Sequence, residues 1–229
     1  MRQAGAARRI GVFGGTFDPV HNGHLRTALE LVGALQLDEL RLIPCHTPAL
    51  RTRPAATATQ RLAMLRLALA DCAPLQCDDR EIRRGSTSYT IDTLRSLRAE
   101  LGASARLCLI VGADAFAAFD SWKEWDRMVE LAHIVVMERP GERPAQSPVL
   151  ARWVAARAAD DIERALGQAP CGGILSLQLT QLAISASHIR ALLSAGYSPR
   201  FLLPDAVLDY IRRHHLYESA TPGEQGASV

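Results

Sequence analysis

Lysine is almost absent from this sequence: of its 26 basic residues, 25 are arginines and one is Lys123. No G-x-x-x-x-G-K-[S/T] motif occurs, which excludes the Walker-A mode of nucleotide binding. Any phosphate that the protein binds must therefore be held mainly by arginine, histidine and backbone N–H groups.

Cysteine pairs and long apolar runs are missing as well. The five cysteines form no C-x-x-C pair, and the apolar segments around several of them predict buried free thiols. No apolar run approaches the roughly 18 residues of a membrane span, and the first residues show no signal-peptide pattern. These absences favour a cytoplasmic protein without a membrane partner.

The sequence also lacks a large excess of positive or negative charge. The formal net charge is only +2, and no basic stripe with interleaved aromatic residues occurs, so no nucleic-acid partner is expected. A content of 48% hydrophobic and 22% charged residues is typical of a globular domain. We expect a single domain over residues 1–217 and a disordered tail at 218–229, which lacks apolar anchors.

Short β-rich runs alternate with longer helical patterns. The runs predict strands at 10–13, 39–44, 105–112, 133–137 and 173–179. The helical patterns cover 23–35, 58–71, 88–101, 148–164, 186–195 and 204–215. Such alternation indicates βαβ units. The predicted fold class is therefore α/β, a doubly wound, mostly parallel, Rossmann-like sheet with a small C-terminal helical portion at about 180–217.

The segment GVFGGTFDPVHNGHL, residues 11–25, joins the first strand to the first helix. Gly14 and Gly15 allow the backbone to approach a ligand closely, and Asp18-Pro19 favours a turn. His21 and His24 then lie at a helix N-terminus, where free N–H groups already favour an anion. Two imidazoles there are candidate phosphate donors; the alternatives are ordinary core or surface histidines, or a zinc site that lacks further ligands at a sensible spacing.

A second candidate phosphate site is ISASHIR, near the C-terminus. Ser185 is placed to cap a helix whose first turn contains Ser187, and Arg190 follows one turn later. The alternative interpretation is a simple capped helix at the surface.

These motifs resemble a known family. GGTFDPVHNGH resembles the (H/T)xGH signature of the nucleotidyltransferase superfamily. Bacterial nicotinate-nucleotide adenylyltransferases share the later segments in the same order, here STSYTIDTL, IVGADAF, FDSWKEW, IVVMERPG, AISASHIR and LLPDAVLDYIRRHHLY. The resemblance covers about residues 9–217. It implies adenylyl transfer from ATP to nicotinic acid mononucleotide, which gives nicotinic acid adenine dinucleotide and pyrophosphate in NAD biosynthesis, with Mg²⁺ carried in on ATP.

The resemblance also implies roles for individual residues. The catalytic residues are His21, His24 and Arg190. The ATP-binding residues are Gly14, Gly15, Thr16, Phe17, His21, His24, Asp114, Ser185 and Arg190. The acceptor-binding residues are Thr90, Trp122, Lys123 and Arg51. Taken alone, Trp122 is as well explained as a core residue, Thr90 as a helix cap, and Asp114 as the first turn of a helix.

The sequence departs from the family in two places. Relatives frequently have P-P-H-(K/R) where this chain has Pro48-Ala49-Leu50-Arg51, so a family histidine is missing and Arg51, Arg53 or His46 would have to replace it. Ala186 stands where the family often has serine or threonine.

Several alternatives stay open. The acceptor could be nicotinamide mononucleotide or another phosphate, as in pantetheine-phosphate adenylyltransferases and cytidylyltransferases, or the chain could be a nucleotide sensor without turnover. Anionic phosphates favour a charged His24 and a helix N-terminus opposes it, so its charge state is open too. The oligomeric state is not determined by the sequence.

Overall fold

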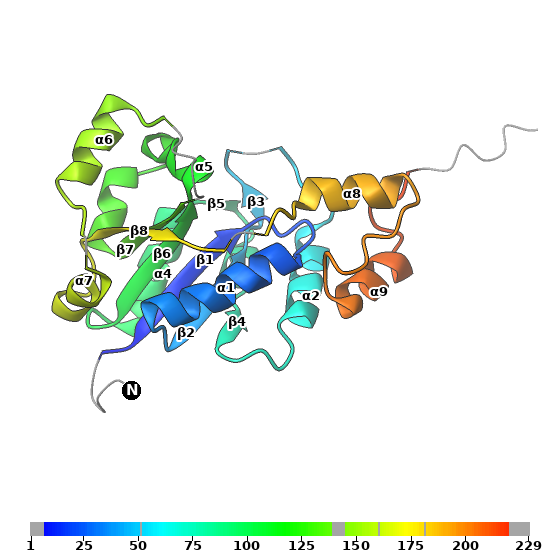
Figure 1. The fold of residues 1–229 in the computed structure, drawn as a ribbon, viewed down its shortest axis with the longest axis horizontal. Coiled ribbons are helices and arrows are strands. Elements are labelled where there is room, and N and C mark those ends of the chain that lie inside the picture. Colours follow the sequence, from blue (N-terminus) through cyan, green and yellow to red (C-terminus); the bar gives the residue numbers. More distant parts are fainter. Residues whose placement is uncertain (1–6, 51, 139–144, 160, 181, 220–229) are drawn as a thin grey trace, which may run out of the picture.

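The computed structural model of the chain describes residues 7–50, 52–138, 145–159, 161–180 and 182–219. Within these residues the central sheet has six strands, all parallel to their neighbours, in the order β4-β2-β1-β6-β7-β8 (Figure 1). The strands are β1 (Arg9–Gly15), β2 (Glu39–Pro44), β4 (Leu75–Cys77), β6 (Arg106–Gly112), β7 (His133–Glu138) and β8 (Ile174–Gln178). The predicted doubly wound, Rossmann-like α/β fold is confirmed.

Helices cover both faces of the sheet (Figure 1). One face packs against α1 (Asn22–Leu35), α2 (Ala58–Ala68) and α7 (Ile162–Gln168). The other packs against α4 (Thr90–Leu101), α5 (Ala113–Phe116), α6 (Pro148–Ala155) and the 3₁₀ turns η1 (Phe119–Ser121) and η2 (Trp125–Glu130). In β6, Cys108 and Ile110 enter the first core whereas Leu109 and Val111 enter the second. Because both faces are covered at the centre of the sheet, the strands β6 and β7 are continuous runs of buried, mainly apolar residues.

The C-terminal helices α8 (Ala186–Ser194) and α9 (Asp205–Arg213) lie beyond the sheet, and α9 packs against α2 (Figure 1). Of the tail predicted at 218–229, residues 220–229 lie outside the described residues. Ser219 is described, and its hydroxyl donates to the carbonyl of Ser194 at the end of α8 (3.1 Å).

The order of the strands reverses beside β1. The chain proceeds outward from β1 to β2 and β4, then returns to place β6 on the other side of β1. Phe13 pairs with Ile110, and Gly15 pairs with Pro44, so the segments that follow β1, β2 and β6 begin side by side. The carboxyl edge at such a reversal is where doubly wound sheets bind ligands.

Two predicted helices need correction. The helix predicted at 148–164 is two helices, because Arg157 and Ala159 exchange hydrogen bonds with Ile174 at the edge of the sheet and Asp161 then caps α7. The helix predicted from residue 88 begins at Thr90, because β5 (Thr87–Ser88) pairs with β3 (Thr47–Pro48) in a small second sheet.

The structure also tests the expectations about short elements, cysteines and membrane spans. The short elements β3, β4, β5 and α3 (Arg80–Arg84) were not predicted. All five cysteines are free thiols as expected, but only Cys108 is fully buried and the other four are half-buried. No helix in the described ranges combines the length and apolar character needed to cross a membrane.

Candidate active site

The connection from β1 to α1 lies at the reversal point of the sheet. Gly15 has a packing reason to be glycine, since a Cβ there would lie 2.8 Å from the ring of Phe17. A Cβ on Gly14 would meet no protein atom within 4 Å, so this position faces open space. Phe17 is buried and packs its ring edge-on against His24, with centroids 5.0 Å apart. The backbone carbonyl of Thr16, which lies between Gly15 and Phe17 in the chain, accepts a hydrogen bond from Arg61 (2.7 Å).

His21 and His24 form a stacked pair at the start of α1. Their ring centroids are 3.7 Å apart, and the ring planes make an angle of 24°. The backbone N–H of His21 donates to Nδ1 of His24 (3.3 Å). A nitrogen that accepts a hydrogen bond carries no proton, so the proton of a neutral His24 ring lies on Nε2. His24 is therefore oriented as a neutral Nε2–H donor.

In the protein without a bound phosphate, burial favours the neutral form of both imidazoles. Burial lowers the pKa of the His21 imidazole from 6.5 to about 4. For His24, burial and the neighbouring His21 lower the pKa to about 3. Nδ1 of His21 is buried without a hydrogen-bond partner among the described residues. A buried polar atom without a partner costs free energy.

Gly23, between the two histidines, makes room for the first of them. A Cβ on Gly23 would lie 3.0 Å from both Cε1 and Nδ1 of His21, closer than a side chain normally packs. The glycine of HNGH is thus explained by the position of the His21 ring. Asn22 fixes the same turn from the other side, because its amide group donates to the carbonyl of Phe201 (2.8 Å).

Helix α8 brings the second predicted motif to the same turn. Ser185 caps α8 as predicted, accepting a hydrogen bond from the backbone N–H of His188 (3.2 Å). The guanidinium of Arg190 donates to the backbone carbonyl of Asp18 (2.6 Å) and to the hydroxyl of Ser187 (3.3 Å). Two motifs far apart in the sequence, HNGH and ISASHIR, therefore meet beside the carboxyl end of β1.

Arg61 of α2 is a part of the site that the sequence reasoning missed. Its side chain is buried, and its guanidinium donates to the carbonyls of Thr16 (2.7 Å), Cys45 (2.6 Å) and His46 (2.9 Å). It thereby joins the segment after β1 to the segment after β2. The one available signal was an arginine amid the apolar residues of the pattern RLAMLRLALA.

Three predicted acceptor residues gather at the start of α4. Lys123 forms an ion pair with Asp92 of α4 (3.2 Å) and lies over the ring of Tyr89, 4.7 Å from its centroid. Trp122 is half-buried and packs on Phe119, with centroids 5.1 Å apart. Thr90, the first residue of α4, is also half-buried. The fourth predicted acceptor residue, Arg51, lies outside the described residues.

The segment after β2 connects the acceptor residues to the turn between β1 and α1 that carries His21 and His24. The backbone N–H of His46 donates to the hydroxyl of Ser88 (3.0 Å), and the carbonyl of His46 accepts from Arg61. Leu50, at the position of the missing family histidine, is 62% exposed, as a side chain without a packing role would be. Asp114 is exposed in the first turn of α5, directly after β6.

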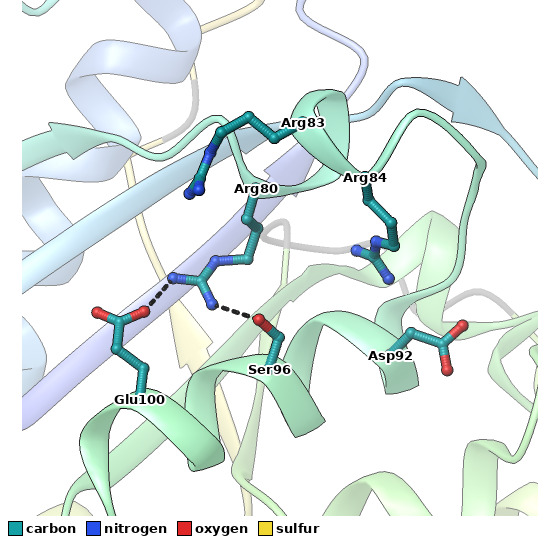
Figure 2. Close-up of a pocket in the computed structure, with 6 residues that line it drawn as sticks. All are labelled: Arg80, Arg83, Arg84, Asp92, Ser96 and Glu100. Carbon is teal, nitrogen blue, oxygen red and sulfur yellow. Dashed lines mark hydrogen bonds and ion pairs between the residues drawn. The ribbon is translucent and has the colours of Figure 1, made fainter.

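A separate hollow of about 520 Å³ lies between α3 and α4, and none of the predicted site residues lines it. Figure 2 shows Arg80 and Arg84 extending from α3 toward α4, where Arg80 donates to Ser96 (3.0 Å) and Glu100 (2.7 Å). Arg80 also pairs with Asp78, and Arg83 with Asp79. Because Arg80 and Arg83 are paired with carboxylates and Arg84 donates to the hydroxyl of Thr93 (2.7 Å), the hollow is a poor phosphate site. Among the described residues, no group of three or more His, Cys, Asp or Glu side chains could hold a metal ion.

Known proteins resemble the chain over nearly its whole length. A model of the cytidylyltransferase-like family matches residues 12–192. The "probable nicotinate-nucleotide adenylyltransferase" of Cellvibrio japonicus is 50% identical over 209 residues, which cover 91% of this chain and 98% of that relative. The protein of the same name from Pseudomonas syringae pv. tomato is 49% identical over 212 residues, 93% of this chain and 95% of the relative.

Solved structures share the fold. A Plasmodium falciparum nicotinic acid mononucleotide adenylyltransferase complexed with NaAD superposes with a TM-score of 0.69 at 17% identity, covering 92% of this chain and 97% of that one. The same enzyme complexed with APC superposes with a TM-score of 0.66 at 16% identity. These superpositions show that the chain shares the fold of those proteins.

Proposed function

Since this chain belongs to the nicotinate-nucleotide adenylyltransferases within the cytidylyltransferase-like family, we propose that it transfers the adenylyl group of ATP to the phosphate of nicotinic acid mononucleotide. The products are nicotinic acid adenine dinucleotide and pyrophosphate. The observation that carries the proposal is the pair of stacked neutral imidazoles beside Arg190 at the reversal point of the sheet. A phosphoryl-transfer site needs such convergent donors.

The chemistry is mainly a matter of positioning. The acceptor phosphate is already an anion at neutral pH, so no general base is required. One of its oxygens forms a bond to the α-phosphorus of ATP while the bond from that phosphorus to the bridging oxygen breaks, and pyrophosphate leaves with the electron pair. No covalent enzyme intermediate forms. Holding the two reactants in line supplies much of the rate enhancement.

Each site residue of the turn has a role in this proposal. His24 donates its Nε2–H to oxygens on which negative charge grows in the transition state, and His21 supports the same phosphate. Arg190 and the α8 start at Ser185 hold the β- and γ-phosphates. Gly14, Gly15, Thr16 and Phe17 border the nucleotide, and Asp114 faces it from the end of β6. In the free protein both imidazoles are neutral, so they meet the nucleotide as dipolar N–H donors, and the phosphates themselves favour their protonation.

Mg²⁺ enters in this proposal as part of the substrate, the Mg²⁺–ATP complex. Magnesium binds phosphate oxygens and keeps several of its waters, so a dedicated protein cage is not needed. The residues of this chain then contact the phosphate oxygens that the metal leaves free.

On the acceptor side, Trp122 stacks on the pyridine ring, and Thr90 donates to the nicotinate carboxylate. Lys123 adds positive charge nearby, while its ion pair with Asp92 anchors it to α4. Arg51 remains the proposed contact for the acceptor phosphate.

The decisive assay supplies purified protein with Mg²⁺, one nucleoside triphosphate and one acceptor, and follows pyrophosphate release. We expect fast release with ATP and nicotinic acid mononucleotide, and much slower release when nicotinamide mononucleotide replaces the acceptor or CTP replaces ATP. A faster reaction with nicotinamide mononucleotide, or with CTP, would assign a different substrate to this site. No release with any pair would favour a sensor without turnover.

A further inference from the structure

The carboxylate of Asp18 ties the β1–α1 turn to two distant parts of the chain. It is almost fully buried and accepts three hydrogen bonds: from the backbone N–H groups of Ala55 (2.8 Å) and Ala56 (3.1 Å), and from the hydroxyl of Tyr217 (2.7 Å). A buried carboxylate needs such partners, because an unpaired charge is costly away from water. Tyr217 is thus one of three donors that keep this charge in place.

The same residue supports Arg190. Nη1 of Arg190 donates to the backbone carbonyl of Asp18, and it lies only 3.9 Å from the carboxylate oxygen Oδ2. A guanidinium at this distance from a carboxylate would form a closer ion pair if the carboxylate lost one of its other donors. Tyr217 donates to the other carboxylate oxygen, Oδ1, so the tyrosine hydroxyl and the Arg190 guanidinium share the negative charge of one carboxylate without sharing an oxygen.

Tyr217 adopts a special backbone conformation to reach Asp18. Its φ is +65°, in the left-handed region that a tyrosine occupies only when its contacts outweigh the cost. Burial and the neighbouring Asp18 carboxylate raise the pKa of the Tyr217 phenol, so its hydroxyl remains a proton donor. Tyr217 also lies beyond residue 192, where the match to the family model ends.

We infer that Tyr217 is a positioning residue for ATP binding: it occupies the Asp18 carboxylate and so leaves the guanidinium of Arg190 available for the triphosphate. The inference rests on the role of Arg190 in the proposed function. Without the tyrosine hydroxyl, Asp18 captures Arg190, and ATP has to break that ion pair before it can bind. The acceptor, bound at α4, is not affected.

The test is Tyr217→Phe, which removes the hydroxyl and keeps the ring. We expect the KM for ATP to rise by roughly tenfold, the worth of one hydrogen bond to a charged group. The kcat at saturating ATP and the KM for nicotinic acid mononucleotide should stay nearly unchanged. The matched control is Tyr197→Phe, which removes a hydroxyl from a tyrosine that is 69% exposed in the α8–α9 connection.

A double-mutant cycle with Arg190→Gln separates positioning from a general loss of structure. If Tyr217 acts through Arg190, then Tyr217→Phe has no further effect on the KM for ATP once the guanidinium is gone. Equal effects in both backgrounds, or a fall in kcat without a change in KM, would overturn the inference. If Arg190→Gln itself leaves the KM for ATP unchanged, the failure lies in the role that the proposed function gives to Arg190.

A measurement on the unaltered protein covers the case in which the variant does not fold. Saturating ATP draws Arg190 away from Asp18 and so strengthens the hold of Tyr217 on the carboxylate. Backbone hydrogen exchange should therefore slow at both 16–20 and 214–219 when ATP binds. Slower exchange at 16–20 alone would mean that Tyr217 does not respond to the nucleotide, contrary to the inference.

Discussion

The rings of His21 and His24 stack with their centroids 3.7 Å apart, and the backbone N–H of the first residue donates to the ring of the second. Two imidazolium ions cannot share this arrangement, because like charges at such a distance repel and burial penalises each of them. The pair is therefore held neutral in the free protein. The Nε2–H donor of His24 is oriented before any nucleotide arrives.

The neutral pair predicts how stability depends on pH. An unfolded His21 binds a proton near pH 6.5, but the folded one does so only near pH 4. Protonation thus favours the unfolded state within this window, and stability present above pH 6.5 is lost as the pH falls toward 4. For His21 the loss should reach about 2 kcal/mol at pH 5. Urea unfolding of the wild type and of His21→Asn at pH 7.5 and pH 5 measures this loss. The pKa of His133 is lowered as well, but His133 is present in both proteins and its contribution cancels in the comparison. Equal pH dependence of the two proteins would contradict the prediction.

The hydrogen bonds of His24 predict an order of activity among its variants. His24→Ala should reduce kcat by about 10²–10³-fold, with a smaller effect on KM, because the donor acts on charge in the transition state. Gln places an N–H near the Nε2 position of histidine, whereas the shorter Asn reaches only the Nδ1 position, where its amide oxygen accepts from the backbone N–H of His21. We therefore expect His24→Gln to retain more activity than His24→Asn. Steady-state kinetics of the three variants test this, and near wild-type kcat in the alanine variant would remove His24 from catalysis.

The contact of Gly23 with the His21 ring predicts a variant that loses activity more than stability. Gly23→Ala adds a Cβ 3.0 Å from that ring, which has to move, while alanine itself favours the helix. Gly33→Ala in the same helix is the matched control, since its Cβ would meet nothing within 4 Å and should stabilise by up to about 1 kcal/mol. Activity assays and thermal unfolding of both variants are the measurements. Full activity in Gly23→Ala would show that the position of the His21 ring is unimportant.

The acceptor assignments predict two different effects on selectivity. Thr90→Val should weaken nicotinic acid mononucleotide selectively, by roughly 1.5–3 kcal/mol, because it removes a hydrogen bond to a carboxylate. Trp122→Ala should weaken both mononucleotides by a similar factor, about 1–3 kcal/mol, because stacking does not distinguish an acid from an amide. The measurement is kcat/KM for both acceptors. Thermal unfolding accompanies it, because Trp122 also packs on Phe119. A change of preference in Trp122→Ala alone would reverse the two roles.

Much of the fold could be predicted because the signals are local. Strands β2, β6, β7 and β8 lie within one residue of their predicted bounds, since each contains several buried apolar residues within a short β-rich run. The family resemblance is confirmed by relatives about half identical to the chain. Elements of two or three residues, such as β3 and β5, escaped because they form only when two distant segments pair. The helix predicted at 148–164 is interrupted because Ala158 pairs with Ile174, a residue distant in the sequence. The one local sign of this interruption was Asp161, a residue type that favours the N-cap of a new helix.

The residues of the site also fall into those that local motifs predict and those that only contacts between distant segments reveal. His21, His24, Ser185 and Arg190 belong to motifs, and the structure brings these motifs to one turn. Asp18 could be recognised only as a turn residue, because its partners at 55, 56 and 217 come from other segments. The position of Arg61 among apolar residues was the one signal for it, but its role could not be predicted, since its three acceptors are backbone carbonyls, which every residue has.

The ion pair of Lys123 with Asp92 has a consequence for chemical labelling. Because the chain contains no other lysine, an amine-reactive reagent can modify only one side chain, and that side chain borders the proposed acceptor site. Acylation would remove the positive charge, leave Asp92 without this partner and place a reporter group next to Trp122. A probe on this side chain, introduced without any mutation, would report on events at the start of α4, and the α-amino group of the chain is the one other amine to account for.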